Sequence, residues 1–315
     1  MSDTKRPRTI AVIGCGNIGS RLLQSAATVE LENLSVFGVE PSEAARNLSA
    51  ERFAQVGRTD GRVNMLKMVN SADELPETVD LLIIACSAHQ RMDALCSTLA
   101  RTRPRAVMLE KVLFTADSDY DRAAELLEGI PTWVNTTRNI WPDYRSLAAR
   151  LTNAPLSLEV TGSDWGLGSN GIHFLALAEL LADSEIKTIM LNDADARDAK
   201  RAGYRELTGT LRAELADDSV ATLISRPGNG DPISIRVEQN GKGYDISETG
   251  GMINSDPFTI LYTSQLGFAL QEMVAERTSN LPTLAQSSRL HRLYLDALRP
   301  AIHPQAPNGD LCMVT

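Results

Sequence analysis

The first half of the chain alternates short apolar runs with segments whose apolar residues recur at helical spacing. Such alternation is typical of a parallel sheet with helices on both faces, and these sheets bind ligands at the carboxyl ends of their strands. We therefore expect an α/β domain with a doubly wound parallel sheet over residues 1–140. Strands are predicted at 9–14, 34–39, 62–69, 80–86, 105–109 and 131–135, and helices at 18–30, 41–54, 88–100 and 117–128.

After Pro142 the pattern changes to strands that follow one another with turns between them. Successive strands predict a mostly antiparallel open sheet, here in a C-terminal α+β domain over residues 141–315. Asn240-Gly241 predicts a hairpin, RPGNGDP at 226–232 a turn, and the tail at 303–315 is expected to be loosely held. Strands are predicted at 156–160, 219–225, 232–238 and 243–247, and helices at 143–152, 171–182, 257–277 and 283–298.

The first predicted strand and helix are joined by glycines in the spacing G-x-G-x-x-G, at Gly14, Gly16 and Gly19. The first glycine allows a tight turn, the second leaves room for a pyrophosphate, and the third lets the helix pack close to its strand. The N-terminus of the helix adds N–H groups and a positive dipole. The second strand ends on Glu40, which is placed to accept hydrogen bonds from an adenosine ribose. This order predicts a Rossmann domain that binds a dinucleotide.

Glu40 favours NAD over NADP, because a carboxylate repels a 2′-phosphate, although Arg46 lies close in the sequence. We expect the glycine loop, Glu40 and the ends of later strands to bind the cofactor. The predicted cofactor-binding residues are Gly14, Gly16, Asn17, Ile18, Gly19, Glu40, Cys86, Ser87, His89 and Glu110.

Composition narrows the classes of function. Of the 315 residues, 43% are apolar and 23% charged, which is typical of a globular protein long enough for two cores. A net charge of −9 argues against nucleic acid as a partner, and no apolar run reaches the length of a membrane span. The cysteines and histidines show no metal-binding spacing, so no metal is expected. Reduced thiols, with no room for a signal peptide before the first strand, predict a cytoplasmic protein.

Several segments resemble the Gfo/Idh/MocA-type oxidoreductases, which include glucose-fructose oxidoreductase and inositol dehydrogenase. The segments are the glycine loop, MLEKVLF at 108–114, Asn135 to Pro142, GIHFLALAELL at 171–181, and LPTLAQSSRLHRLYLDAL at 281–298. The resemblance implies a Rossmann domain, an open-sheet domain, and hydride transfer between NAD(P) and a secondary alcohol or ketone of a sugar, cyclitol or nucleotide-linked sugar. WGLGSNGIH, with KRAGYRELTGTL at 200–211, is similar to a branch in surface-polysaccharide and sugar-nucleotide pathways.

The chain departs from that family's pattern at three positions. The family often has an aspartate four residues before its histidine and an acid three residues after it, where this chain has Ser169 and Ala176. The proline of the family's E-K-P segment is Val112 here. A His–Asp pair is therefore not carried over, and Ser169 and Asn170 are expected to orient the histidine or to bind a substrate hydroxyl.

Oxidising an alcohol requires a group that takes the hydroxyl proton as a hydride leaves carbon. Lys111 follows a buried strand, where desolvation and a cationic nicotinamide would lower its pKa, and the resemblance makes it the substrate-contacting lysine. We expect Glu110 to orient either this lysine or the backbone. His173, near the start of an apolar helix, is the second candidate. A surface ion pair and a buried structural histidine are the alternative interpretations. The predicted substrate contacts are Lys111, Asn139, Trp165, Ser169, Asn170 and His173, with Trp165 as an apolar platform.

Arg197, Lys200 and Arg201 form a cluster of cations before a Gly-Tyr pair. The plainer interpretation is a solvated surface. The sharper hypothesis is a phosphate clamp for a nucleotide-linked substrate.

Two other functions compete with a sugar dehydrogenase. One is an amino-acid or imine reductase of the dihydrodipicolinate reductase or homoserine dehydrogenase kind. The other is a non-catalytic NAD-binding sensor or assembly subunit, which the serine at position 169 supports. Whatever the function, we expect a homodimer or homotetramer that pairs through the C-terminal sheet. The open face of that sheet is predicted to carry Ile224, Ile233, Ile235 and Val237.

Overall fold

The computed structural model describes residues 7–228, 230–306 and 309–314, which form two compact units that are not contiguous in sequence. The first unit contains the chain to Phe114, with Asp119–Asn135 and Leu261–Leu284. The second contains Thr115–Ser118, Thr136–Ile260 and the chain from Ala285. The segment Leu261–Leu284, expected in the C-terminal domain, therefore packs with the first unit.

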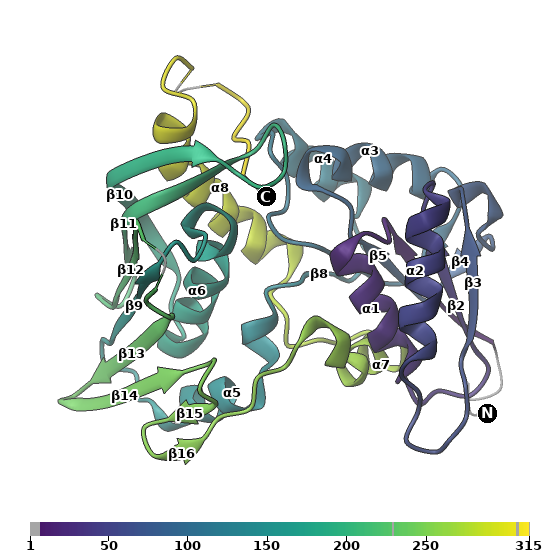
Figure 1. The fold of residues 1–315 in the computed structure, drawn as a ribbon, viewed down its shortest axis with the longest axis horizontal. Helices are drawn as coiled ribbons and strands as arrows, with labels where there is room; N and C mark the ends of the chain where they lie inside the picture. The colour runs from purple at the N-terminus through teal and green to yellow at the C-terminus, as the bar shows by residue number, and fades with distance from the viewer. Residues whose placement is uncertain (1–6, 229, 307–308, 315) are drawn as a thin grey trace. The chain divides into compact units, whose positions relative to one another are not determined.

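The first unit is built on a six-stranded, wholly parallel sheet in the order β3-β2-β1-β5-β7-β8, with helices beside it (Figure 1). All six predicted strands are confirmed. The strands are β1 (Arg8–Ile13), β2 (Leu34–Val39), β3 (Met65–Val69), β5 (Leu81–Ile84), β7 (Val107–Leu109) and β8 (Thr132–Val134), with a separate short pair of β4 (Thr78–Val79) and β6 (Arg103–Pro104). The helices are α1 (Asn17–Ala27), α2 (Glu43–Ala54), α3 (Ala88–Leu99), α4 (Ser118–Leu126) and α7 (Gly267–Ala275), with 3₁₀ turns at Ala72–Glu74 and Thr263–Gln265.

The central strands of this sheet are buried on both faces, which explains why they read as continuous apolar runs. Ile10 to Val12 and Leu81 to Ile84 are fully excluded from solvent. A parallel sheet covered by helices on both faces requires apolar side chains in both directions. The carboxyl ends of β1 and β5 consequently lie side by side, because these strands pair in register from Ile10 with Leu81 to Ile13 with Ile84.

The second unit is built on an eight-stranded sheet in the order β10-β11-β12-β9-β13-β14-β15-β16, in which β9 and β12 are parallel and the other pairs antiparallel. The apolar helix α6 packs against β11 and β12. The strands are β9 (Ser157–Ser163), β10 (Ile186–Asp198), β11 (Arg205–Leu215), β12 (Val220–Arg226), β13 (Ser234–Gln239), β14 (Lys242–Ser247), β15 (Met252–Ile253) and β16 (Asp256–Pro257). The helices are α5 (Pro142–Arg150), α6 (Leu167–Ala182) and α8 (Leu284–Ile302), with a 3₁₀ turn, η3, at Thr137–Ile140.

Two of the longest strands, β10 and β11, escaped prediction. β10 is an edge strand whose side chains are mostly exposed, so it lacks the apolar alternation that marks a half-buried strand. β11 alternates in burial over its second half, but Gly209 and several charged residues interrupt the pattern. Periodicity alone therefore missed β11, one of the two strands against which α6 packs.

The helix predicted at 257–277 is wrong. The chain there forms β16, a loop and a 3₁₀ turn before the nine-residue α7 begins at Gly267. Its apolar residues serve two cores: Phe258 packs on Trp141 and Tyr144 in the second unit, whereas Leu270 is buried in the first. One apolar run was thus divided between two units.

The turn predictions had mixed outcomes. The hairpin of β13 and β14 is confirmed, and Asn240 and Gly241 have the positive φ angles, 52° and 74°, that such a two-residue turn requires. The RPGNGDP segment, whose Asn229 lies outside the described residues, does not join neighbouring strands. β9 lies between β12 and β13 and pairs in parallel with the former.

The tail predicted to be loosely held is instead packed into the second unit over its described part; residues 307, 308 and 315 lie outside that part. Cys312 donates its backbone N–H to the carbonyl of Thr115 at 2.7 Å, and Met313 accepts from the N–H of Arg205 at 2.8 Å. Cys312 and Val314 are fully buried. Anchoring by backbone hydrogen bonds and two apolar side chains replaces the expected disorder.

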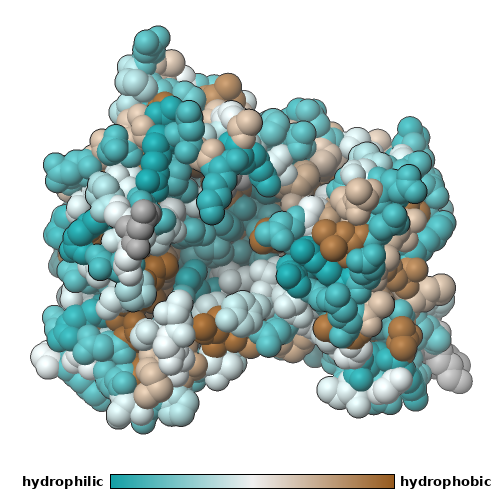
Figure 2. All heavy atoms as spheres, viewed as in Figure 1, coloured by the Kyte–Doolittle hydropathy of each residue, from teal (hydrophilic) through white to brown (hydrophobic). Residues whose placement is uncertain are grey.

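The four residues predicted for the open face of the second sheet do not share one environment, since Ile224 and Ile233 are half-buried. Ile235 and Val237 are fully buried, while the alternate residues Arg236 and Glu238 are exposed. Figure 2 shows mostly hydrophilic side chains over β10 and β11 as well. The apolar positions of β13 belong to the core of the unit, because successive side chains of a strand point to opposite faces.

Candidate active site

The glycine loop has the shape that its spacing predicts. Gly14 has a φ of +81°, and a Cβ there would lie 2.8 Å from the backbone nitrogen of Cys86. A Cβ on Gly19 would lie 2.0 Å from the carbonyl oxygen of Gly14, so helix and loop touch at this point. Gly16 is exposed, and a Cβ there would meet nothing within 4 Å. Two glycines therefore fit the fold, and the third faces open space.

The N-terminus of α1 is open toward that space. Asn17 and Ile18 are exposed, and no side chain among the described residues caps this end of the helix. Backbone N–H groups and the helix dipole at such an end bind anions, above all phosphates. The residues present therefore fit a pyrophosphate.

Glu40 lies half-buried at the carboxyl end of β2, beside the loop. Its Oε2 accepts the N–H of Cys15 and its Oε1 the N–H of Ser42, both at 3.0 Å. A carboxylate oxygen has two lone-pair directions, so each retains one for a ribose hydroxyl. Arg46 donates instead to the backbone carbonyls of Glu40 and Pro41, both at 2.7 Å.

Cys15, inside the loop, is a packed thiol. Burial and the neighbouring Glu40 raise its pKa to about 12. Since the thiolate is the reactive form, this cysteine is inert at neutral pH. Cys86 is half-buried, and burial raises the pKa of its thiol as well.

Lys111 follows β7 at the carboxyl edge of the parallel sheet and is half-buried. Its backbone N–H donates to Oε2 of the buried Glu110 at 3.2 Å, and the amide of Asn135 donates to Oε1. Burial raises the pKa of Glu110, and the hydrogen bond from Asn135 opposes the rise. Glu110 thus accepts a hydrogen bond from the backbone of Lys111. The peptide bond between Lys111 and Val112 is cis.

Arg91 joins two loops at the same edge, a role that the sequence did not predict. Only 2% of the residue is exposed. Its guanidinium donates to the carbonyls of Val112 and Leu113, and to that of Cys86 at 2.6 Å. It therefore joins the loop after β5 to the loop after β7. A signal was available, because this arginine occupies an apolar position of α3, three residues after Ala88 and four before Leu95.

The remaining cofactor residues of the prediction begin α3. Ser87 is the N-cap and donates its hydroxyl to the side chain of Gln90 at 2.7 Å. His89 is exposed in the first turn of the helix. The first unit therefore brings the predicted cofactor residues together at one edge of its sheet.

The predicted substrate residues other than Lys111, which belongs to the first unit, lie around α6 in the second unit. His173 is 9% exposed on this helix, and Ser169 and Asn170 lie one turn before it. The side chains of Ser169 and Asn170 bond to the carbonyls of Gly166 at 3.3 Å and Trp165 at 2.9 Å, respectively. The helix begins four residues earlier than predicted, so both residues belong to its first turn.

Asn139 is buried in the 3₁₀ turn η3 and donates to the carbonyl of Ala176 on α6 at 3.1 Å. The neighbouring Arg138 makes two hydrogen bonds of 2.6 Å to Glu248, which also accepts from the hydroxyl of Tyr144 at 2.7 Å. The Arg138 guanidinium lies 4.1 Å from the ring centroid of Phe174.

Burial lowers the pKa of Arg138, but the hydrogen bonds and the charge of Glu248 outweigh it and raise that pKa overall. Sequence reasoning did not find this pair, because its partners are 110 residues apart. The pair holds the Arg138 guanidinium against the ring of Phe174, the residue that follows His173 on α6.

A pocket of about 660 Å³, here called the α6 pocket, opens beside these residues. Trp165 in its wall is held by a hydrogen bond from Nε1 to the carbonyl of Ile224 at 2.9 Å and by an edge-on contact with Phe174. The structure thus unites the predicted Trp165, Ser169 and Asn170 with the three cations of the phosphate-clamp hypothesis. The α6 pocket is lined by residues 164–166, 169, 170, 197–201 and 206.

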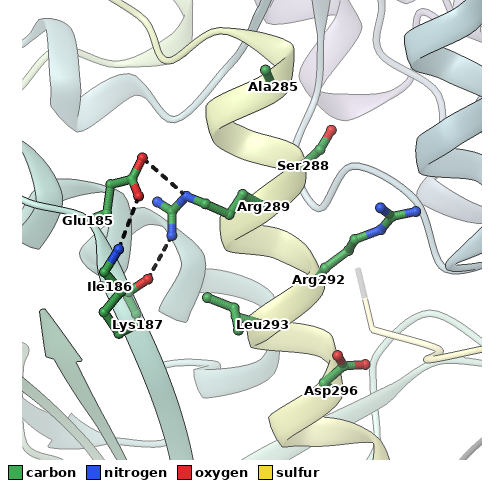
Figure 3. A pocket seen from close by; sticks show the side chains of 9 residues that line it. All are labelled: Glu185, Ile186, Lys187, Ala285, Ser288, Arg289, Arg292, Leu293 and Asp296. Atoms are coloured by element: carbon green, nitrogen blue, oxygen red, sulfur yellow. Dashed lines mark hydrogen bonds and ion pairs between the residues drawn. The ribbon is translucent and has the colours of Figure 1, made fainter. Parts of the chain in front are cut away.

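A second pocket of about 550 Å³, the α8 pocket, lies between the start of β10 and α8 (Figure 3). None of the predicted site residues line it. Arg289 points toward Glu185 and Ile186, donating to the carbonyl of Ile186 at 2.7 Å and to the carboxylate of Glu179. Arg292 binds Asp117 at 3.0 Å. Its arginines therefore serve the fold.

Among the residues that the structure describes, no group of three or more His, Cys, Asp or Glu side chains is arranged to hold a metal ion. Over the same residues, no helix combines the length and apolar character needed to cross a membrane.

Comparison with known proteins gives matches in structure but not in sequence. No protein-family model matches the sequence, and no curated protein matches it significantly. GenD2 from gentamicin A biosynthesis, solved in complex with NAD, matches with a TM-score of 0.72 and 17% identity over 96% of both chains. UDP-N-acetylglucosamine 3-dehydrogenase GnnA from Acidithiobacillus ferrooxidans matches at 0.70 and 17%, over 94% of this chain and 97% of that one.

Myo-inositol dehydrogenase from Lactobacillus casei, solved with NAD(H) and myo-inositol, matches with a TM-score of 0.64 and 14% identity, over 91% of this chain and 92% of that one. At these identities the likeness concerns the fold. The predicted fold class and the resemblance to inositol dehydrogenases are confirmed at that level, across nearly the whole chain.

Proposed function

We propose that this protein is an NAD-dependent oxidoreductase that transfers a hydride between nicotinamide and a secondary alcohol or ketone of a sugar-like substrate. The glycine loop carries the proposal: two glycines admit no side chain, the third faces open space at an uncapped helix N-terminus, and Glu40 lies beside them. The structurally similar proteins support it, since one was solved with NAD, another with NAD(H) and myo-inositol, and a third is a sugar-nucleotide dehydrogenase.

Each predicted group has a distinct role in this proposal. The glycine loop and the N-terminus of α1 bind the pyrophosphate, and Glu40 binds the adenosine ribose and disfavours a 2′-phosphate. When bound, NAD supplies the hydride acceptor. Lys111 and His173 carry the hydroxyl proton, and Glu110 and Arg91 position the backbone on either side of Lys111. Ser169, Asn170, Asn139 and Trp165 contact the substrate.

The testing experiment is native mass spectrometry of the purified protein, followed by NADH fluorescence titration and a panel of polyols, sugars and sugar nucleotides assayed at 340 nm. We expect bound NAD(H) and turnover of a sugar-like alcohol. Failure to bind either NADH or NADPH overturns the proposal. Turnover of imines or amino-acid semialdehydes instead would favour the reductase alternative.

One observation favours a non-catalytic NAD-binding protein. Ser169 occupies the position of the family's aspartate, and its hydroxyl bonds to the Gly166 carbonyl within the same helix turn. Tight NADH binding without turnover of any panel member would support this second candidate.

We also infer a cytoplasmic protein that self-associates through its second sheet. All four cysteines are unbridged, which suits a reducing compartment. Because the exposed side chains of β13 are charged, the pairing surface is expected to be polar rather than apolar. Light scattering tests the assembly, and a monomeric mass would contradict it.

A further inference from the structure

We propose that Arg138 is a positioning residue for the substrate, because it holds Phe174 against Trp165 in the wall of the α6 pocket. This inference rests on the proposed function, in which Trp165 contacts a sugar-like substrate. The three side chains come from η3, from α6 and from the segment between β9 and α6, and all belong to the second unit. They form a chain of contacts that begins at a buried ion pair and ends at the pocket.

The charges of the α6 pocket balance, so charge alone does not favour an anion there. Its lining has three cations and three carboxylates, which are Arg197, Lys200, Arg201, Asp164, Asp198 and Glu206. The aromatic member of the lining is Trp165. An indole ring offers a large apolar surface, on which the ring of a sugar-like substrate would lie. The position of Trp165 is therefore expected to set the affinity for that substrate.

Three neighbours hold Trp165 in place. Its Nε1 donates to the carbonyl of Ile224 at 2.9 Å. A Cβ on Gly162 would lie only 3.1 Å from Cδ1 of Trp165, so this glycine leaves room for the indole. The ring of Phe174 meets the indole edge-on, with centroids 5.4 Å apart and an interplanar angle of 84°, which is a favoured geometry for an aromatic pair. Of the three neighbours, Phe174 is the one whose contact depends on the orientation of a second side chain.

Phe174 in turn contacts Arg138. The Cζ atom of Arg138 lies 4.1 Å from the ring centroid of Phe174. Phe174 is fully buried, and only 13% of the Arg138 side chain is exposed. The attraction between a cation and an aromatic ring is stronger where both are desolvated. The guanidinium therefore restrains the ring that packs on Trp165.

Glu248 fixes the orientation of the guanidinium. Nε and Nη2 of Arg138 donate to the two carboxylate oxygens, both at 2.6 Å, and the hydroxyl of Tyr144 donates to the same carboxylate at 2.7 Å. A planar fork bound through two parallel hydrogen bonds cannot turn without losing one of them. A buried ion pair is often no more stabilising than apolar residues of the same volume. Its presence beside Phe174 therefore points to a positioning role.

A second arginine of the same unit provides a matched comparison. The Cζ atom of Arg150 lies 5.6 Å from the ring centroid of Tyr244. Arg150 is exposed at the end of α5, and neither it nor Tyr244 lines the α6 pocket. Arg150→Lys therefore changes the same kind of contact without touching the groups that hold Trp165.

The kinetic test compares Arg138→Lys and Phe174→Leu with wild type. The first substitution keeps a positive charge beside Glu248 but loses the planar fork, and the second removes the ring. The substrate is whichever member of the panel of polyols, sugars and sugar nucleotides the wild type turns over fastest. We expect KM to rise about 3- to 10-fold in each variant, as for one lost aromatic contact, while kcat stays within about twofold.

Two further variants calibrate this test. Trp165→Leu removes the platform itself and should raise KM at least as much as either variant, whereas Arg150→Lys should keep the wild-type KM. The affinity for NADH should be unchanged throughout, because the glycine loop belongs to the first unit. A merely structural role for Arg138 would lower the melting temperature and leave KM unchanged, and that result would overturn the inference.

A double-mutant cycle shows whether Arg138 acts through Phe174. If it does, Arg138→Lys/Phe174→Leu should raise KM no more than the larger of the two single effects, because the effects of residues in contact are not additive. Increases in KM that multiply would mean that the two side chains act separately, which contradicts the inference.

Quenching of tryptophan fluorescence by acrylamide follows Trp165 without turnover. Trp133 and Trp141 are only 6% and 5% exposed, so the half-buried Trp165 dominates the quenching. A Trp141→Phe background removes the tryptophan that Arg138 also contacts, at 5.4 Å. In that background we expect Arg138→Lys and Phe174→Leu to increase the quenching.

The outcomes separate this inference from the proposed function. Unchanged KM and unchanged quenching in both variants overturn the inference while the proposed function stands. Absence of NADH binding and of turnover in the wild type defeats the proposed function. In that case, quenching still decides whether Arg138 positions Trp165.

Discussion

The two units present their proposed binding residues in different ways. In the first unit, the cofactor cradle is backbone: Gly14, Gly16, Gly19 and the N–H groups at the start of α1. In the second, the residues proposed to contact the substrate are side chains, and the ion pair of Arg138 and Glu248 lies beside one of them, Asn139. A backbone cradle tolerates changes of side chain but not an added Cβ, whereas a side-chain array is sensitive to every truncation. Substitutions in the two units should therefore fail in different assays.

Lys111 is an exception to this contrast, because it belongs to the first unit but its proposed chemical role depends on its side chain. Lys111→Met should lower kcat by about 10²- to 10⁴-fold, the usual contribution of a positioned acid–base group, while leaving the NADH affinity unchanged. Steady-state kinetics and fluorescence titration measure the two effects. Lys67→Met, a lysine on β3 of the same unit, is the matched control. A full-activity Lys111→Met variant would assign this lysine to the surface-ion-pair interpretation.

The second unit should lose stability when its central pair is broken on one side only. Arg138→Met leaves the Glu248 carboxylate buried without its cation, which typically costs about 3–5 kcal/mol in unfolding free energy. The double variant Arg138→Met/Glu248→Met should recover most of that loss, because both charges are gone. Denaturant unfolding measures each variant. Equal losses in the single and double variants would show that the arginine acts through packing on Phe174 rather than through its charge.

Substitutions at two glycines of the loop should affect different properties, one the stability of the fold and the other the binding of NADH. Gly19→Ala should destabilise the protein by about 1–3 kcal/mol, because the added Cβ overlaps the Gly14 carbonyl. Gly16→Ala adds a methyl group to open space, so its melting temperature should not change, while its NADH affinity falls by about tenfold or more. A Gly16→Ala variant with wild-type affinity would mean that no pyrophosphate approaches this loop.

Two buried thiols give each unit its own dependence on pH. Burial raises the pKa of Cys15 and of Cys312 to about 12 from an ordinary value of 9.0. Between these values the folded thiols keep protons that the unfolded chain has lost, so the unfolding free energy falls as pH rises. The slope approaches about 1.4 kcal/mol per pH unit for each thiol.

Urea unfolding of wild type and of Cys15→Ala/Cys312→Ala between pH 8 and 10 isolates this part of the slope. The variant should show a shallower decline. Identical slopes would mean that the two thiols titrate alike in the folded and unfolded chains.

Prediction from sequence was strongest where the signal is local. The parallel strands are continuous apolar runs because both their faces are covered, and the glycine spacing describes a turn only six residues long. It was weakest at β10, whose exposed side chains carry no alternation, and at 257–277, where one apolar run supplies two cores. The C-terminal tail shows the same limit, since its anchors are Thr115 and Arg205.

The sequence by itself thus determined the six-stranded parallel sheet, the shape of the glycine loop and the residues proposed for proton transfer, because each depends on spacing within a short segment. Only the tertiary structure decided that Arg91 joins two strand-end loops, that Arg138 and Glu248 pair, and that residues 164–170 meet residues 197–206 around one pocket. The physical reason is that a buried charge is paired with whichever groups the packing of elements brings beside it. A pocket is lined by groups brought together in the same way, and in both cases those groups are distant in the chain.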